Sequence, residues 1–514
     1  MKRRWYIVVV AVMVLFVCAL TENSVYASSK GTIKCNAISS GKVVVRAAIK
    51  KTVKSSDNYY YLVRVSPLTD ACIDDVAKTK KCKKPVFKLK MSKDAAYVQN
   101  KYVVAVKKGS KFYPVTASSY VNQVEKGANN KEKYFIPKTK KGIQYTNFDE
   151  LRSCGAKNTF LNLPVSSILT GNTYVEYKYN GRTYHFTDLA AYRVTVYDFN
   201  KNNINITMQL LLNWGDGSYT RLIDSRARTE GKNYYTWNTQ DRYAREEMEA
   251  IFSYLASIFG KSDCHVDNWV LGNEVNACDM WNYRGTMSDD DFIKAYSYSF
   301  MALYKAVRSE RANSKVFVCL DHTWGIETDG FGGKDFLYRF NKALKSYQKG
   351  IRFNIAYHAY PVPLYDSDYW NNSHTDNTEN SPYVTLKNID VLTNYVRKHY
   401  TSKTRIILSE QGFTAKKGQS VQSAAIAMGY YKAACNAMID SFIIRSYSDD
   451  PGEAAMGLTM GIKGRSAFKV YKYMDTSKSL KYTKKYLKTI GVSSWNKVVS
   501  NFNKARLYKM FRIE

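Results

Sequence analysis

Two glutamates each end an apolar run that has the length of a β-strand. Glu274 follows the run in "NWVLGNEVN" (268–276), and Glu410 ends the run in "TRIILSEQGF" (404–413). Taking an unpaired carboxylate out of water is costly, so a strand end is a poor place for a charge without a role. Two carboxylates over one cleft can cleave a glycosidic bond: one protonates the leaving oxygen, and the other attacks the anomeric carbon or activates water. The alternative for either glutamate is a structural ion pair with a lysine or arginine at a strand end.

From about residue 142 onward, candidate strands alternate with helical patterns. Helices are expected over 240–259, from the Ser288 cap to about Arg311, and over 334–347, 384–399 and 420–438. The candidate strands are "GIQYTN", "NTFLNLPVS", "INITMQLLLNW", "NWVLGNE", "KVFVCLDH", "RFNIAYHAYP", "TRIILSEQGF" and "DSFIIRSYSDD". Repeated βα units predict a closed (β/α)8 TIM barrel. A doubly wound open sheet is the weaker alternative, because no glycine-rich turn opens a helix.

The barrel would bring the two glutamates together. The carboxyl ends of all its strands face one mouth, and Glu274 and Glu410 end the fourth and seventh candidate strands. An acid there needs a pKa raised by burial or by its partner's charge, whereas a nucleophile needs hydrogen bonds that keep it ionised. The spacing therefore predicts one two-carboxylate site.

Tryptophans follow several of the candidate strands. Sugars present C–H faces that pack on flat aromatic rings, so a ring of such side chains around a cleft suits a glycan. Each one alone could equally anchor its own loop. The candidates for stacking are Trp214, Trp281 and Trp324, and Trp237 and Trp370 occupy similar places.

Asp321 and His322 end the fifth candidate strand in "LDHTW". No serine in a strained elbow accompanies them, so they are interpreted as polar residues that line the mouth and either contact substrate or support the residues that do. No cysteine or histidine spacing resembles a metal cage, and neither a metal nor another cofactor is expected.

"GNEVN" followed by "LSEQGF" resembles the acid/base and nucleophile strands of the clan A glycoside hydrolases, retaining enzymes built on a β/α barrel. In that clan an asparagine precedes the acid/base, as Asn273 does here, and the sixth strand carries a histidine and a tyrosine, as in "AYHAYP". The resemblance implies that Glu274 is the acid/base and Glu410 the nucleophile. Asn273 would then hold a sugar hydroxyl and Tyr360 would donate to Glu410. His358 would orient a hydroxyl or the acid, unless it is only a satisfied histidine at a strand end.

Residues of roughly 140–450 are similar to a family of secreted bacterial proteins known only as domain of unknown function 5722. The similarity rests on "LLLNW", "LGNEVNACDMWN", "LDHTW", "AYHAYP" and "IILSEQGF". It implies a barrel of glycosidase type without a settled substrate. Clan members often place a tryptophan after the eighth strand, where this chain has Arg445 and Tyr447. Arg445 is either a binder of a carboxylate, sulfate or phosphate on the glycan or the partner of Asp449 or Asp450.

The first 27 residues have the pattern of a signal peptide. Lys2, Arg3 and Arg4 precede a short apolar run, and "VYA" offers a cleavage site after Ala27. The chain is therefore predicted to be secreted, either free or associated with the cell wall, with no membrane span left after cleavage. A retained N-terminal anchor is the alternative.

Residues 28–136 alternate apolar and polar side chains and predict a small all-β sandwich domain ahead of a barrel domain over 137–514. The chain carries a formal charge of +33, and residues 28–141 contain 26 Lys and Arg against 7 Asp and Glu. Such a field attracts polyanions, so an anionic wall polymer is the expected partner of this domain, unless the lysines only solubilise it. Secretion makes nucleic acid an unexpected partner.

These observations predict a secreted retaining glycoside hydrolase that acts on a poly- or oligosaccharide through two glutamates. Two alternatives share the same residues. One is a glycan-binding or wall-binding barrel protein without turnover, and the other is a transglycosylase that passes the sugar to an acceptor other than water.

Overall fold

The computed structural model describes residues 30–144 and 146–503. The predicted signal peptide over 1–27 lies outside these residues and stays a prediction, as do the boundaries at 136 and 137. The described residues fall into two compact units. One contains residues up to 36 with 45–88 and 100–119, and the other contains 37–44, 89–99 and 120 onward.

The N-terminal part of the chain consists mainly of β-strands, as predicted for a sandwich, with one short helix, α1 (Ala96–Gln99). β1 (Gly31–Ser39), β2 (Lys42–Ile49) and β5 (Val86–Lys90) form a three-stranded sheet. A second sheet, which is antiparallel, has the order β4 (Cys72–Lys80), β3 (Tyr59–Val65), β6 (Lys101–Lys108), β7 (Lys111–Pro114). Its alternating pattern places apolar side chains on one buried face, namely Tyr61, Val63, Val65, Val103 and Ala105.

A closed barrel of eight parallel strands follows, which confirms the predicted fold class. β9 pairs with both β10 and β18, so no edge strand remains. The strands in order are β9 (Lys141–Gln144), β10 (Asn158–Pro164), β13 (Asn205–Leu211), β14 (Asn268–Leu271), β15 (Lys315–Leu320), β16 (Asn354–Tyr357), β17 (Ile406–Gln411) and β18 (Ile439–Ile444). Each of them lies within or beside one of the eight candidate strands.

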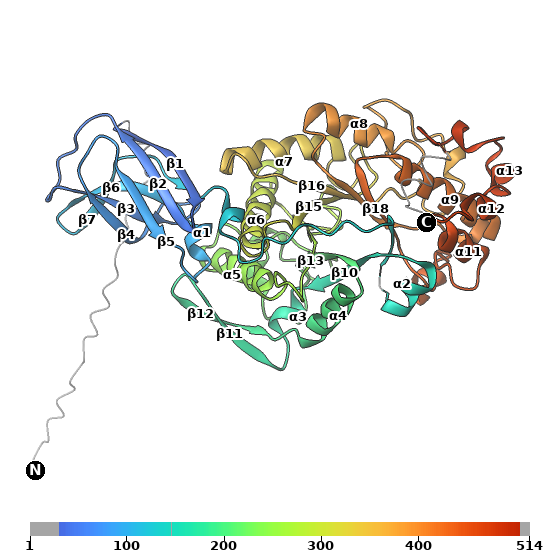
Figure 1. Cartoon of the computed structure of the whole chain (residues 1–514), viewed down its shortest axis with the longest axis horizontal. Helices are drawn as coiled ribbons and strands as arrows, with labels where there is room; N and C mark the ends of the chain where they lie inside the picture. Colours follow the sequence, from blue (N-terminus) through green and yellow to red (C-terminus); the bar gives the residue numbers. More distant parts are fainter. Residues whose placement is uncertain (1–29, 145, 504–514) are drawn as a thin grey trace, which may run out of the picture. The chain divides into compact units, whose positions relative to one another are not determined.

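Helices lie between the barrel strands and cover the outside of the barrel (Figure 1). They are α2 (Phe148–Cys154), α4 (Ala190–Lys201), α5 (Arg242–Ile258), α6 (Asp289–Glu310), α7 (Gly333–Tyr347), α8 (Asp390–His399) and α9 (Gln419–Cys435), followed by α11 (Ser466–Tyr473), α12 (Ser479–Thr483) and α13 (Tyr486–Ile490). α6 begins as predicted, with the Ser288 hydroxyl accepting from the Asp291 N–H. α8 begins six residues later than its predicted start at 384, because the Asn388 side chain accepts from the Thr385 N–H and holds the preceding residues in a turn.

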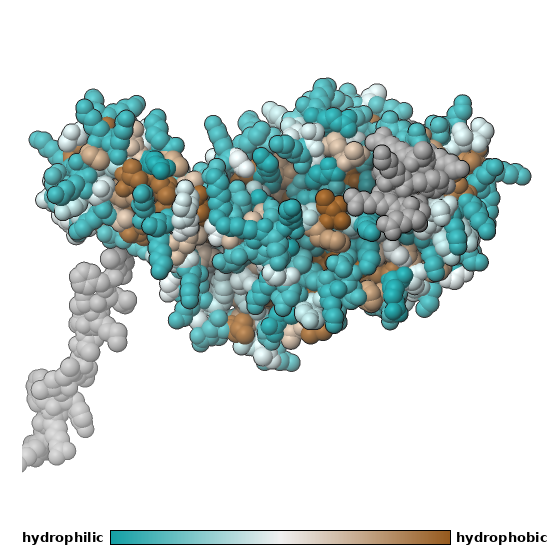
Figure 2. Space-filling view, in the orientation of Figure 1, coloured by the Kyte–Doolittle hydropathy of each residue, from teal (hydrophilic) through white to brown (hydrophobic). Residues whose placement is uncertain are grey.

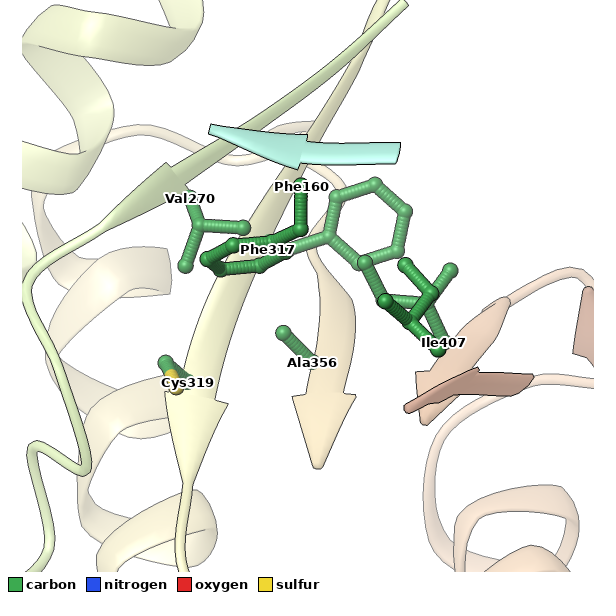
Figure 3. Packing of buried hydrophobic residues seen from close by; sticks show 7 residues of the cluster. Phe160, Val270, Phe317, Cys319, Ala356 and Ile407 are labelled. Carbon is green, nitrogen blue, oxygen red and sulfur yellow. The ribbon is translucent and has the colours of Figure 1, made fainter. Parts of the chain in front are cut away.

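Apolar side chains fill the interior of the barrel (Figure 3). Seven residues from six of its strands form a cluster in which none exposes more than 1% of its surface: Phe160, Val270, Phe317, Cys319, Ala356, Ile407 and Ile443. The interior is therefore a core and not a pore, and functional side chains are expected at the carboxyl ends of the strands and in the loops that follow them. The outer surface is different in character, since the face drawn in Figure 2 is mostly hydrophilic with small separate hydrophobic patches.

Candidate active site

Glu274 lies beyond the end of β14 in an unusual backbone conformation. Gly272 has φ +71°, and a Cβ there would come within 2.6 Å of the Asn282 Oδ1, so the turn requires a glycine. Glu274 itself has φ +39°, the left-handed region that costs a non-glycine residue about 1–3 kcal/mol. Hydrogen bonds on both sides hold it there: the Val275 N–H donates to the Cys319 carbonyl, and the Ala277 N–H donates to the Glu274 carbonyl.

The Glu274 carboxyl is held by His358, which follows β16. The His358 Nδ1 lies 2.7 Å from the Glu274 Oε1, and its Nε2 lies 3.4 Å from the Cys319 Sγ. His358 is fully buried, whereas the Glu274 side chain keeps 13% of its surface exposed. Burial raises the pKa of the Glu274 carboxyl, and the negative charges of Asp321 and Glu410 raise it further, against the opposing effect of His358.

Glu410 is the penultimate residue of β17, and several donors surround it. The Tyr360 hydroxyl donates to the Glu410 Oε1 at 2.6 Å, the Arg445 Nε lies 3.6 Å from the same oxygen, and the Gln144 side chain also donates to the carboxylate. Burial by itself raises the pKa of Glu410, but the charges of His358 and Arg445 and the hydrogen bonds from Tyr360 and Gln144 outweigh it and bring that pKa below its ordinary value.

The two carboxyls belong to one site because the segment after β16 serves both. His358 holds Glu274, Tyr360 holds Glu410, and the two rings stand edge to face with centroids 6.3 Å apart. The charge of Glu410 also reaches His358: burial alone lowers the His358 pKa, but the sulfur of Cys319 and the carboxylates of Glu410 and Glu274 bring it well above its usual range. The predicted placement at the fourth and seventh strands is thus what the barrel shows, with the pKa of one carboxyl raised and that of the other lowered.

Asn273 precedes Glu274 and is oriented from inside the barrel. Its Oδ1 accepts from the Gln209 Nε2 at 3.0 Å, and the same Nε2 donates to the Gly272 carbonyl at 2.9 Å. The half-buried side chain of Asn273 therefore turns its amide nitrogen away from Gln209, where it can donate to a ligand.

Arg445 follows β18 and connects Glu410 to a third carboxylate. Its Nη2 lies 2.6 Å from the Oε1 of Glu453, on α10 (Pro451–Ala455). The alternative prediction, that Arg445 forms an ion pair with Asp449 or Asp450, is wrong. Asp449 pairs with Arg465, and Asp450 caps α10 by accepting from the Glu453 N–H.

Asp321 and His322 lie beside the site and contact neighbouring residues, which agrees with the supporting role that the sequence allows; contact with substrate stays a prediction. The Asp321 carboxylate accepts from the Asn276 side chain and from both the N–H and the hydroxyl of Thr323, so it ties the loop after β14 to the loop after β15. His322 packs against Tyr383 with ring centroids 5.7 Å apart, and burial lowers its pKa. Its charge environment includes Asp321 and His358, which places it next to the site.

The predicted aromatic platform divides into two groups. Trp214 and Trp281 are half-buried and pair with neighbouring tyrosines: Trp214 with Tyr235 at 5.7 Å and Trp281 with Tyr234 at 6.5 Å between centroids. Tyr234 lies near Glu410, because the charges of Glu410 and Arg445 both act on its hydroxyl. Trp281, which packs on Tyr234, therefore lies beside the same site.

Trp324 has no exposed surface, which corrects the expectation that it stacks on substrate. Its indole N–H donates to the Glu379 carbonyl, and its ring packs edge-on against Tyr395. Tyr447 is also occupied away from the two glutamates: its hydroxyl lies 3.3 Å from that of Ser153 on α2, and its ring packs on Phe468 of α11.

Four residues of the site were not predicted: Gln144, Gln209, Glu453 and Tyr234. Gln144 and Gln209 are polar residues within barrel strands, and this pattern could have drawn attention to them. Nothing in the local sequence marks Glu453 or Tyr234, since each reaches the site from a loop or a short helix. Within residues 30–144 and 146–503, no group of three His, Cys, Asp or Glu side chains is arranged to hold a metal ion. No helix in the same ranges is long and apolar enough to cross a membrane.

Comparison with known proteins gave one family match. The model of a family of unknown function (DUF5722) matches residues 133–498. No curated protein matches the chain.

Among solved structures, the chain is similar to the β-D-glucuronidase of Dictyoglomus thermophilum, with 13% identity and a TM-score of 0.36 over 86% of this chain and 68% of that one. The β-glucuronidase of Bacteroides uniformis is 11% identical with a TM-score of 0.37, over 87% of this chain and 50% of that one. This chain therefore spans about half of the length of that enzyme. A family 1 β-glucosidase from Thermotoga maritima is 12% identical with a TM-score of 0.41, over 63% of this chain and 84% of that one. Similarity at this level carries no argument about activity, which must come from the site itself.

Proposed function

The chain belongs to a family of unknown function (DUF5722), and we propose that it is a retaining glycoside hydrolase with Glu274 as acid/base and Glu410 as nucleophile. One observation carries the proposal: two carboxyls at one barrel mouth have pKa values shifted in opposite directions, upward for Glu274 and downward for Glu410. A carboxyl with a raised pKa beside a carboxylate with a lowered pKa is the pair that glycosidic cleavage needs.

In the first step, Glu410 attacks the anomeric carbon while the bond from that carbon to the leaving oxygen breaks. The leaving oxygen takes the proton of Glu274, and a glycosyl ester forms on Glu410. In the second step, Glu274, now a carboxylate, takes a proton from water as the water attacks the same carbon, and Glu410 leaves as a carboxylate. The Glu274 Oε1 is occupied by His358, so the proton is transferred from Oε2.

The strained backbone supports a functional role for Glu274. A left-handed glutamate costs about 1–3 kcal/mol, and such strain clusters at active sites and ligand clamps. The opposite pKa shifts of the two carboxyls favour an enzyme over a barrel that only binds glycan. A transglycosylase would use the same residues and differ only in the acceptor of the second step.

Export from the cell and binding of an anionic wall polymer remain proposals that rest on the sequence. The first comes from the N-terminal pattern, and the second comes from the basic charge of residues 28–141. The site adds one expectation about substrate, namely that Trp281 and Tyr234 pack against a sugar ring next to Glu410.

The test is a screen of aryl glycosides and polysaccharides with the full chain and three matched variants: Glu274→Ala, Glu410→Ala and Glu327→Ala. Glu327 is an exposed glutamate after β15 and serves as the control. We expect the two site variants to lose about 10²–10⁴-fold or more in turnover with unchanged thermal unfolding, because each removes an acid, base or nucleophile. The control should keep full activity.

Proton NMR of the first-formed product then tests the mechanism. The anomeric configuration should be retained. An inverted product would overturn the assignment of Glu410 as nucleophile, and near-normal turnover in either site variant would overturn the proposal as a whole. Product that forms only when a second sugar is added would assign the protein as a transglycosylase.

A further inference from the structure

A second cavity lies at the opposite end of the barrel from the two glutamates. It has a volume of about 310 Å³ and lies where β15, β16 and β17 begin and where α6, α7 and α8 end. Because all barrel strands are parallel, these strand beginnings lie on the face away from the active-site mouth. The cavity is therefore separate from the site described above.

The side chains around this cavity are strongly basic, and none of the lining residues is an aspartate or glutamate. Lys315 and Arg405 share Asp440 as ion-pair partner, so these two cations are partly neutralised. Four further cations line the cavity without an ion pair to any carboxylate in the described part of the chain: Arg308, Lys345, Arg352 and Lys403.

Arg308 shows an unmet hydrogen-bonding capacity. Its Nη1 donates to the Ser314 carbonyl at 3.3 Å, but its Nε is buried without a partner among the described residues. The charge of Arg308 therefore adds to the positive field of the cavity without a carboxylate partner among the described residues.

A simpler explanation is that these cations only complement the helix ends, since Arg308 and Lys345 lie in the last turns of α6 and α7. The negative charge at the helix ends is too small to account for all of these cations. Three helix ends contribute about half a negative charge each, so they balance fewer than two cations. Arg352 and Lys403 lie outside the helices, and the positive charge of the cavity remains in excess.

The cavity also has aromatic walls. Tyr304, Phe353 and Tyr400 line it, and the rings of Phe353 and Tyr400 stand edge to face at 5.4 Å. Aromatic faces pack against the C–H faces of sugar rings. The volume is at the lower end of the range of about 300–1,000 Å³ for small-molecule sites, which suits a monosaccharide with one substituent.

We propose that this cavity binds a sugar phosphate, with Lys345 and Arg352 on the phosphate and the aromatic walls on the sugar. A phosphate monoester brings about two negative charges at pH 7, which matches the excess of cations better than a single carboxylate does. This proposal stands apart from the glycosidase mechanism, because it uses none of the same residues.

The test measures binding of glucose 6-phosphate to the full chain by calorimetry at about 0.15 M salt. Glucose, inorganic phosphate and glucuronate are the comparison ligands. The test variant is Lys345→Gln with Arg352→Gln, and the matched control is Lys342→Gln with Lys349→Gln. All four residues are exposed, and each pair removes the same charge from the same region.

Glucose 6-phosphate should bind more tightly than inorganic phosphate or glucuronate, and glucose should not bind measurably. The test variant should lose about tenfold or more in affinity, while the control stays within about twofold. An equal loss of affinity in both variants would show that only the overall positive charge matters, and it would overturn the proposed site. No binding to the unaltered chain at about 10 mM would also overturn it, since even a Kd of about 1 mM would then be visible. Phosphate alone binding as tightly as the sugar phosphate would refute the role of the sugar.

Discussion

The hydrogen bond from Tyr360 to Glu410 can be removed without disturbing the backbone. Tyr360→Phe deletes only the hydroxyl that donates to the Glu410 Oε1 at 2.6 Å. The ring stays, and its place beside Gly412 is preserved, where a Cβ would come within 2.8 Å of the Tyr360 Cε1. Any change in catalysis then reports the hydrogen bond and not the packing.

The expected magnitude follows from the charge on the acceptor. A hydrogen bond to an ionised group contributes about 1.5–3 kcal/mol, and each pKa unit corresponds to about 1.4 kcal/mol. Without it, the pKa of Glu410 should rise, because the bond is one of the interactions that lower it. Turnover at neutral pH should fall by about 10–100-fold, since the same bond helps to stabilise the charge on Glu410 when it leaves.

The assay is the pH dependence of kcat/KM on an aryl glycoside. Its acidic limb reports the ionisation of the nucleophile in the free enzyme, so the limb should move to higher pH. The control is Tyr357→Phe, which removes a hydroxyl from the last residue of β16, three positions before Tyr360. That hydroxyl donates to the Val384 carbonyl at 3.0 Å and touches neither glutamate. The control should lower stability by about 1 kcal/mol and leave the acidic limb in place.

An acidic limb that stays in place in Tyr360→Phe would refute the role of Glu410 as an ionised nucleophile held by Tyr360. A limb that moves equally in both variants would show a general effect of removing a buried hydroxyl.

Two further changes test the electrostatics of the barrel. His358→Gln removes a hydrogen bond and a charge that lower the pKa of Glu274. The basic limb of kcat/KM should therefore move to higher pH, and the rate should fall. A basic limb that moves to lower pH would contradict this reasoning. Asp267 lies just before β14, and its burial raises its pKa to about 7. Its contribution to the stability of the fold is therefore present while the carboxyl is protonated, and it is lost as the pH rises toward about 7. Asp267→Asn keeps an acceptor for the Ile206 N–H. At pH 8 this variant should unfold at a higher urea concentration than the unaltered chain, with a gain in the free energy of unfolding of no more than about 4 kcal/mol, and at pH 4 the two should differ little. Equal stability at pH 8 would show that the buried carboxylate has no such cost.

The order of the strands and the two glutamates could be predicted because both depend on local patterns. An apolar run predicts a strand wherever it lies, and eight such runs separated by helical patterns leave few closed arrangements. Once the barrel is assumed, Glu274 and Glu410 must share a mouth, since parallel strands end on one face. Asn273, His358 and Tyr360 were expected at the site because of the resemblance to clan A glycoside hydrolases, and each of them lies a few residues from a strand end.

Other features depended on how loops and helices that are distant in sequence meet. Arg445 was expected to pair with Asp449 or Asp450, its neighbours in sequence, but only the folded position of α10 brings Glu453 to it. Trp324 follows a strand as Trp281 does, yet one ring is buried and the other is half-exposed. The left-handed conformation of Glu274 and the basic cavity at the far end of the barrel have no signature in any short stretch.

The sequence by itself determined the barrel, its strand order and the pair of carboxyls, because periodicity and strand ends are properties of short segments. Only the tertiary structure decided which donors surround each carboxyl and which way its pKa moves. Burial and charge act through space, and residues such as Gln144 and Arg445, some 300 positions apart, reach the same carboxylate only after the barrel has closed.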